Sequence, residues 1–222
     1  MNRALVIAVH PDDETLGCGG TLLKHKSNND EIHWLIVSDI KESDGFDKST
    51  IAKRDKEIYK VEKLYNFNSV HKLGFSTAKI DEYSMSILIE KISSVINKVK
   101  PNIIYLPFKG DIHSDHKNVF NAAHSCTKSF RYPFIEKVYM METLSETEFS
   151  LSSKDSSFIP NVFVDISDYM NQKIDLMKIY DGEMGVHPFP RSVRNIKALA
   201  TFRGATAGCE YSESFMLIKE LK

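Results

Sequence analysis

Residues 4–20 read ALVIAVHPDDETLGCGG, and this stretch decides the fold. Its first part, Ala4–Val9, is a short apolar run bounded by polar residues, which predicts a buried β-strand. The polar turn HPDDE follows, and Thr15–His25 is predicted as a helix. A strand that leads directly into a helix is typical of the first half of a βαβ unit.

The same alternation continues through the first half of the chain. Further strands are predicted at Ile32–Val37, Val70–Phe75 and Asn102–Phe108, and helices at Ile51–Leu64 and Met85–Val99. Strands alternating with helices of this length indicate parallel pairing. We therefore expect an α/β fold of three layers, with a mostly parallel sheet and helices on both faces.

The second half of the chain is less regular. Strands are predicted at Val138–Thr143 and Val162–Ile166, helices at Ser167–Tyr180 and Val193–Phe202, and an exposed loop at Ser145–Ser157. No repeat or linker divides the chain, and its 222 residues suit one compact domain. We predict a single domain over residues 1–222.

Composition narrows the classes of protein. The 29 basic and 30 acidic residues leave a net charge of -1 without a basic stripe, so no nucleic-acid partner is predicted. No apolar run approaches the length of a membrane span, and the start lacks the pattern of a signal peptide. Three separated cysteines suggest no disulfide framework, and we expect a cytoplasmic protein. A homo-oligomer is compatible with these features.

Dense polar chemistry follows two of the predicted strands. His10–Glu14 comes directly after Ala4–Val9, and Asp111–His116 comes just after Asn102–Phe108. In an open parallel sheet, sites form beyond the carboxyl ends of the strands. Either cluster alone could be a capped helix start with surface histidines, but two clusters at equivalent strand ends favour a functional site.

The residue types in these clusters suit a metal centre. Imidazole and carboxylate are zinc ligands, and a catalytic zinc site uses three protein ligands with a fourth position for water. We predict that His10, Asp13 and His116 bind Zn²⁺. Fe²⁺ or another divalent ion could use the same ligands.

The remaining polar residues of the clusters then have chemical roles. Asp12, beside a ligand, is predicted as the general base that deprotonates zinc-bound water. His113 is predicted to stabilise the oxyanion formed when water attacks a carbonyl. Asp115 is predicted to hold the ring of His113 and to favour its protonated form.

The segments AVHPDDE (8–14), LGCGGTL (16–22) and HSDH (113–116) resemble the LmbE/PIG-L-like N-deacetylases, a family with a Rossmann-like fold. The resemblance implies the ligand set and the catalytic roles given above, and it also implies that Arg54 holds a sugar substrate. Some members have a tyrosine where this chain has Asp111. Segments around His187 and Arg203 resemble the C-terminal signature of a bacterial branch.

We therefore expect a metal-dependent N-deacetylase that hydrolyses the acetamide of a small N-acetylated sugar, sugar conjugate or sugar nucleotide. Two alternatives stay open: a nucleotide-binding oxidoreductase of Rossmann type and a non-catalytic binding protein of the same fold. The acidic turn after the first strand argues against the first, because its charge would repel a phosphate. His187 and Arg191 could line the pocket or only shape a loop, and Arg203 could bind an anion or pin the C-terminal segment.

Overall fold

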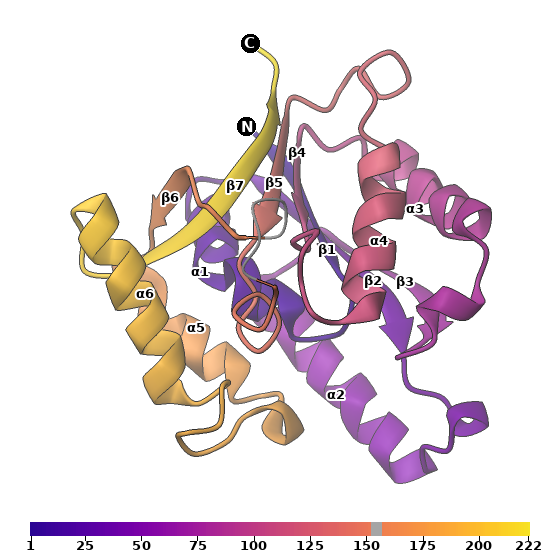
Figure 1. Cartoon of the computed structure of the whole chain (residues 1–222), viewed down its shortest axis with the longest axis horizontal. Coiled ribbons are helices and arrows are strands. Elements are labelled where there is room, and N and C mark those ends of the chain that lie inside the picture. Colours follow the sequence, from indigo (N-terminus) through magenta and orange to yellow (C-terminus); the bar gives the residue numbers. More distant parts are fainter. Residues whose placement is uncertain (152–156) are drawn as a thin grey trace.

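The structure, a computed structural model, describes residues 1–151 and 157–222. Within these residues, seven strands form one sheet in the order β3-β2-β1-β4-β5-β7-β6 (Figure 1). The strands are β1 (Arg3–Ala8), β2 (Glu31–Asp39), β3 (Ser69–Ser76), β4 (Ile103–Leu106), β5 (Lys137–Met141), β6 (Val162–Asp165) and β7 (Ser212–Glu220). The longer helices are α1 (Asp13–Ser27), α2 (Lys48–Tyr65), α3 (Met85–Val99), α4 (Ser114–Ser125), α5 (Met170–Met177) and α6 (Val193–Ala207).

The sheet is mostly parallel, as the sequence predicts. β1 pairs in parallel with β2 on one side and with β4 on the other, and β3 and β5 extend these two halves. The chain order therefore reverses direction at β1, and the crevice between β1 and β4 is the place where such folds bind ligands. β7 pairs antiparallel with both β5 and β6.

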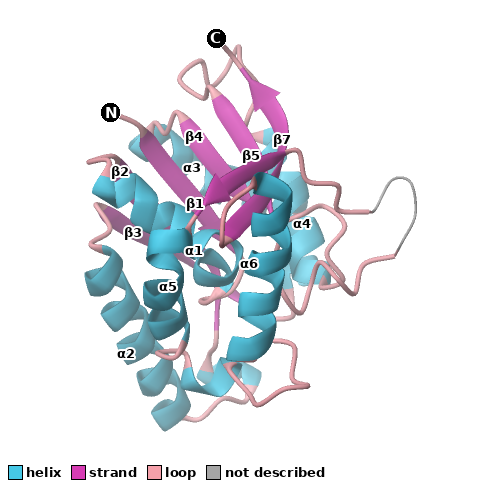
Figure 2. Ribbon diagram, turned by 90° about the vertical axis from the view of Figure 1, so that its left-hand side faces the viewer, coloured by secondary structure: helices cyan, strands magenta, loops and turns pink. Residues whose placement is uncertain are grey.

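Helices cover both faces of the sheet, which confirms the predicted three layers. The core on one face is formed with α1, α2, α5 and α6, and the core on the other face is formed with α3 and α4. Figure 2 shows α1, α5 and α6 in front of the sheet and α3 behind it. The central strands are apolar along their length because both of their faces are buried.

The glycines of α1 serve close packing. A Cβ on Gly20 would lie 2.7 Å from Cβ of Ile166, and one on Gly17 would lie 2.9 Å from Cβ of Met141. Helix α1 is buried from Asp13 to Leu23, so glycine lets neighbouring elements approach it. This packing explains the glycine-rich segment without a bound phosphate.

Two elements differ from the sequence-based expectation. Helix α4 continues the HSDH segment to Ser125, and β7 occupies most of the segment after Tyr211. The first four residues of β7, Ser212–Phe215, are buried although three of them are polar. A strand with buried polar residues lacks the apolar pattern from which strands are predicted.

The predicted helix Ser167–Tyr180 is wrong in extent. A 3₁₀ turn spans Ser167–Tyr169, and α5 ends at Met177. Tyr180 leaves helical geometry, and its buried hydroxyl donates to Glu14 at 2.9 Å. This bond to α1 fixes where the chain turns away. At the other helix, α6 runs five residues beyond the predicted end and stops at Gly208, whose φ is 74°.

The predicted exposed loop Ser145–Ser157 is wrong at its start. Thr147 is buried, and its hydroxyl donates to Asp111 at 2.7 Å. Residues 152–156 lie outside the described part of the chain.

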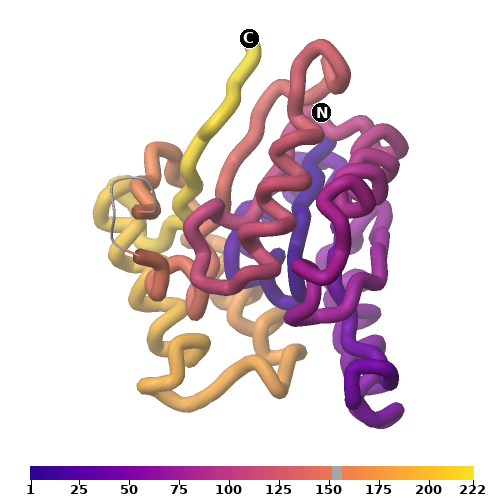
Figure 3. The backbone as a smooth tube through the Cα atoms, turned by 45° about the vertical axis from the view of Figure 1, so that its right-hand side comes forward, coloured from indigo at the N-terminus to yellow at the C-terminus, as the bar shows by residue number. Residues whose placement is uncertain are grey.

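The two chain ends lie at the same end of the molecule (Figure 3). Because β1 begins at Arg3, the amino ends of the parallel strands lie there, and their carboxyl ends point away from it. None of the described helices is long and apolar enough to cross a membrane.

Candidate metal centre

A pocket of about 400 Å³ opens at the carboxyl ends of the parallel strands. Its walls come from the turn after β1, the end of β2, the loop after β3 and the loop before α4, and also from α2, the segment after β5 and the segment between α5 and α6. Both polar clusters of the sequence therefore contribute to one cavity, as expected for the crevice where the strand order reverses.

The turn after β1 aims Asp13 back at the strand end. One of its carboxylate oxygens, Oδ2, accepts from the backbone N–H of Val9 at 2.9 Å and from that of His10 at 2.8 Å. Asp12 precedes it with a φ of 131°, a conformation that non-glycine residues rarely adopt. Such strain is typical of functional turns that their surroundings hold in place.

His10, Asp13 and His116 converge, with ligand atoms within 4.8 Å of one another, and His10 and Asp13 line this pocket. Oδ2 of Asp13 lies 3.4 Å from Nε2 of His116 and 3.9 Å from Nδ1 of His10. Ligands of a tetrahedral zinc ion stand roughly 3.3 Å apart when each is about 2.0–2.1 Å from the metal. The three residues therefore fit a divalent cation with little rearrangement.

A buried nitrogen supports this fit. Nε2 of His116 is buried and has no hydrogen-bond partner among the described residues. Burial alone would lower the pKa of His116, but the carboxylates of Asp13 and Asp111 outweigh it and raise this pKa to about 9. The surroundings of the ring thus favour positive charge, which a bound cation would supply in place of a proton.

Asp111 is the partner of His116 that the sequence did not reveal. Its Oδ2 lies 2.8 Å from Nδ1 of His116, and its Oδ1 accepts from the hydroxyl of Thr147. A ligand histidine commonly donates its other ring N–H to a carboxylate, which fixes the tautomer. The only sequence signal was the presence of Asp111 in the same cluster as His116.

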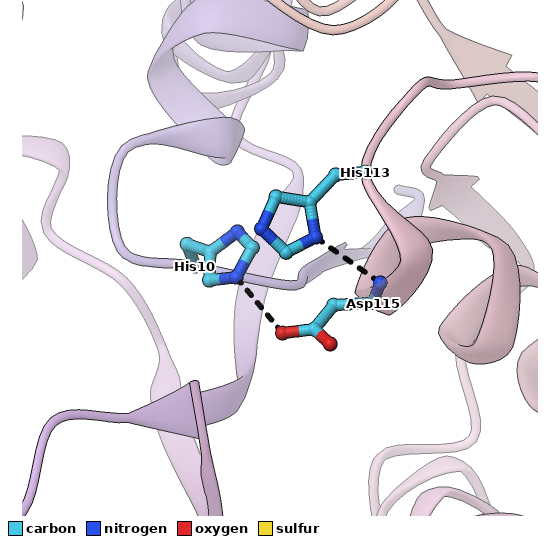
Figure 4. Close-up of side chains that lie close together, drawn as sticks. All are labelled: His10, His113 and Asp115. Carbon is cyan, nitrogen blue, oxygen red and sulfur yellow. Dashed lines mark hydrogen bonds and ion pairs between the residues drawn. The ribbon is translucent and has the colours of Figure 1, made fainter. Parts of the chain in front are cut away.

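Asp115 is placed differently from the prediction. Its carboxylate lies 3.3 Å from Nε2 of His10, and it also accepts from the backbone N–H groups of Ala78 and Ile80. Its link to His113 runs through its own backbone N–H, which donates to Nδ1 of His113 at 3.1 Å (Figure 4). The hydrogen bond between these two residues therefore uses the backbone of Asp115 and not, as predicted, its carboxylate.

The charge state expected for His113 is also not favoured here. Burial and the nearby His10 lower the pKa of His113, although Asp115 acts in the opposite direction. Because Nδ1 accepts a backbone N–H, a neutral ring carries its proton on Nε2. His113 lines the pocket, and its neutral ring can donate a hydrogen bond from Nε2 without carrying a positive charge.

Asp12 lies in the same pocket and is almost fully buried. Burial, followed by the neighbouring carboxylates of Asp13 and Glu183, raises the pKa of Asp12 well above its usual value. One guanidinium opposes this effect: Nη1 of Arg191 lies 3.6 Å from Oδ2 of Asp12.

Arg54 also lines the pocket, but it has partners within the protein. Its Nη2 is paired with Glu183, and its Nη1 donates to the carbonyl of Pro11 at 3.2 Å. The predicted contact of Arg54 with a sugar stays a prediction.

The other C-terminal candidates divide clearly. Arg191 lines the pocket, whereas His187 is exposed and is not among the lining residues. Arg203 forms two hydrogen bonds with Glu142, which also accepts from the hydroxyl of Ser214. Arg203 thus pins α6 to the sheet.

Sequence comparisons find relatives of this chain. Residues 5–127 match the family model PIG-L, described as GlcNAc-PI de-N-acetylase. A diacetylchitobiose deacetylase from Thermococcus kodakarensis is 23% identical over 232 residues, covering 98% of this chain and 84% of that protein.

Solved structures share the fold. The conserved protein TT1542 from Thermus thermophilus aligns with a TM-score of 0.78 and 23% identity, covering 100% of this chain and 97% of its own. GalB, a 4-carboxy-2-hydroxymuconate hydratase from Pseudomonas putida, aligns with a TM-score of 0.77 and 14% identity, covering 100% and 98%. Because a hydratase has this architecture, the fold alone does not choose the reaction.

Proposed function

Because this chain belongs to the PIG-L family of GlcNAc-PI de-N-acetylases, we propose that it hydrolyses the acetamide of a small N-acetylated sugar, sugar conjugate or sugar nucleotide. The matching relative named as a diacetylchitobiose deacetylase supports this substrate class. The observation that carries the proposal is the position of Asp12, a buried carboxylate beside a ligand set for a divalent cation.

His10, Asp13 and His116 would hold the cation, which we propose to be Zn²⁺, with Fe²⁺ as the alternative. When bound, such an ion polarises a carbonyl group and lowers the pKa of water. The two imidazoles and one carboxylate leave a coordination position free for these tasks.

Asp12 is proposed as the base and then the acid. It removes a proton from the attacking water, and the water oxygen forms a bond with the amide carbon. The carbon–nitrogen bond then breaks while Asp12 passes the same proton to the leaving nitrogen. Acetic acid and a free amine result, and the acid loses its remaining proton to solvent to give acetate. The raised pKa of Asp12 suits a carboxyl group that must hold a proton between two steps.

His113 is proposed to stabilise the tetrahedral intermediate. With Nδ1 accepting from the backbone of Asp115, the proton on Nε2 can be donated to the developing oxyanion. A neutral donor is sufficient for this role. We therefore replace the protonated His113 expected from the sequence with a neutral one.

Substitution of Asp12 tests the proposal. Wild-type protein loaded with Zn²⁺ should deacetylate at least one member of a panel of N-acetylated sugars and sugar nucleotides. Asp12→Asn should lower kcat by about 10³-fold or more while zinc stays bound, because the residue that moves the proton is lost. Release of acetate and metal content are measured together.

Asp81→Asn is the control, because it removes an exposed carboxylate outside the pocket. Near-normal turnover by Asp12→Asn would contradict the role of this residue. A wild-type protein that binds zinc but turns over no member of the panel would favour the non-catalytic alternative.

A further inference from the structure

Two arginines share one glutamate at the wall of the pocket. Arg54 comes from α2, Glu183 from the 3₁₀ turn η4 (Asp181–Glu183) and Arg191 from the segment before α6. One oxygen of Glu183 pairs with Nη2 of Arg54, and the other lies 2.9 Å from Nη2 of Arg191. The side chains of all three are less than a quarter exposed.

The free ends of the two guanidiniums reach the same turn. Nη1 of Arg54 donates to the carbonyl of Pro11, and Nη1 of Arg191 faces the carboxylate of Asp12 at 3.6 Å. One arginine thus holds the backbone just before Asp12, and the other lies against its side chain. Glu183 fixes both arginines relative to each other.

The turn that they hold is a strained one. Asp12 has a φ of 131°, and its N–H donates to Oε2 of Glu14 at 3.1 Å. Residues in such conformations persist only where several contacts over-determine them. Two hydrogen bonds hold the backbone on either side of this peptide: Arg54 donates to the carbonyl of Pro11, and the N–H of Asp12 donates to Glu14. The ion pair with Arg191 holds the Asp12 side chain.

We propose that Arg54, Glu183 and Arg191 form a brace that positions Asp12 for proton transfer, so that these three act as positioning residues. The inference rests on the proposed hydrolysis and goes beyond it, because it gives the two arginines a task within the protein. Nη1 and Nη2 of both arginines face Glu183, Pro11 or Asp12, which supports this task.

Kinetics separate the two roles. A positioning residue affects the chemical step, whereas a substrate ligand affects binding. With a substrate that the wild type hydrolyses, we expect Arg191→Met to lower kcat by about 10- to 100-fold with KM changed less than about threefold. Arg191→Lys, which keeps the charge opposite Asp12, should recover part of kcat. A rise in KM with unchanged kcat would overturn the brace.

A neighbouring ion pair supplies a matched control. Nζ of Lys53 lies 3.0 Å from Oδ2 of Asp181, and this exposed pair joins the same helix α2 to the same turn η4. Lys53→Gln should leave kcat and KM near their wild-type values. An equal loss of kcat in Lys53→Gln and Arg191→Met would mean that tethering of α2 to η4 matters, and not the contacts with Asp12.

Coordinates of a variant test the brace independently of turnover. Glu183→Gln removes the charge that holds both guanidiniums while keeping nearly the same shape. In a crystal structure of this variant with Zn²⁺, we expect the Arg54–Pro11 and Arg191–Asp12 contacts to be lost and the Asp12 side chain to move. An unchanged turn would overturn the inference even if the wild type is active. If the wild type is inactive but the turn is displaced in Glu183→Gln, the proposed function is refuted, whereas the role of Glu183 in holding the Asp12 turn is supported.

Discussion

Single hydrogen bonds decide which nitrogen of each histidine can face a cation. Nδ1 of His116 is engaged by Asp111, so Nε2 points toward Asp13. His10 has the reverse arrangement, because its Nε2 faces Asp115 and its Nδ1 faces Asp13. Two carboxylates outside the ligand set thus orient both imidazoles toward one point.

Asp111 should therefore control metal affinity. Asp111→Asn keeps the size of the side chain but removes the charge that supports the His116 ring. We expect the affinity for Zn²⁺ to fall by about 10- to 100-fold, the range found for such outer partners. Isothermal titration of the metal-free protein with Zn²⁺ measures the change.

Asp39→Asn is the matched control, because Asp39 lines the same pocket and its carboxylate bonds to the N–H of Ile40 and lies near Lys72. It removes an equal charge without touching either histidine. Equal losses of affinity in the two variants would mean that net charge, and not the bond to His116, governs binding.

The convergence of the three predicted ligands could be anticipated from the sequence. His10 and Asp13 lie at the turn after β1, and His116 lies in the first turn of α4, the helix that follows β4, so their places depend on local sequence and on the parallel sheet. Glu183 and Arg191 could not be placed in the same way, because the packing of the α5–α6 segment against α2 brings them to the pocket. The carboxylate of Asp115 faces His10 because α4 begins beside the loop after β3.

Among the elements, α1 and β7 depend on each other. Helix α1 has a kink at Cys18, where the backbone leaves helical geometry. Glu213 of β7 accepts from the N–H groups of Gly20 and Thr21, which begin the second part of the helix. Its charge is balanced by the buried Lys173 of α5 at 2.7 Å.

These contacts of Glu213 with α1 explain why β7 is not predicted from the sequence. Its polar start, Ser212–Ser214, is buried to serve α1 and other neighbours, so it lacks the apolar alternation of a strand. The preceding strands β1, β2 and β4 were predictable because both of their faces are covered by helices.

Loss of the Glu213 charge should destabilise the fold. Glu213→Gln leaves the ammonium group of Lys173 buried without a counter-charge, and we expect the free energy of unfolding to fall by about 3–5 kcal/mol. Urea denaturation followed by circular dichroism measures this free energy. Glu210→Gln, three residues earlier and exposed, should change it by less than about 0.5 kcal/mol. Similar values for the two variants would contradict a stabilising role for the contacts of Glu213 with Lys173 and α1.

Across the whole molecule, the reversal of strand order at β1 brings the two polar clusters together. More than a hundred positions separate His10 from Asp115, yet their side chains lie 3.3 Å apart because β1 and β4 are neighbours in the sheet. The fold determines where the polar residues lie. The family match and the residues of the pocket indicate that the reaction is a deacetylation.

Anomalous X-ray diffraction at the zinc absorption edge can locate a cation bound by His10, Asp13 and His116. In crystals of the wild type grown with equimolar Zn²⁺, we predict one strong peak about 2.0–2.2 Å from Nδ1 of His10, Oδ2 of Asp13 and Nε2 of His116. The peak should disappear in His116→Ala. A zinc ion bound elsewhere, or no peak among these three atoms, would contradict the assignment of these residues as metal ligands.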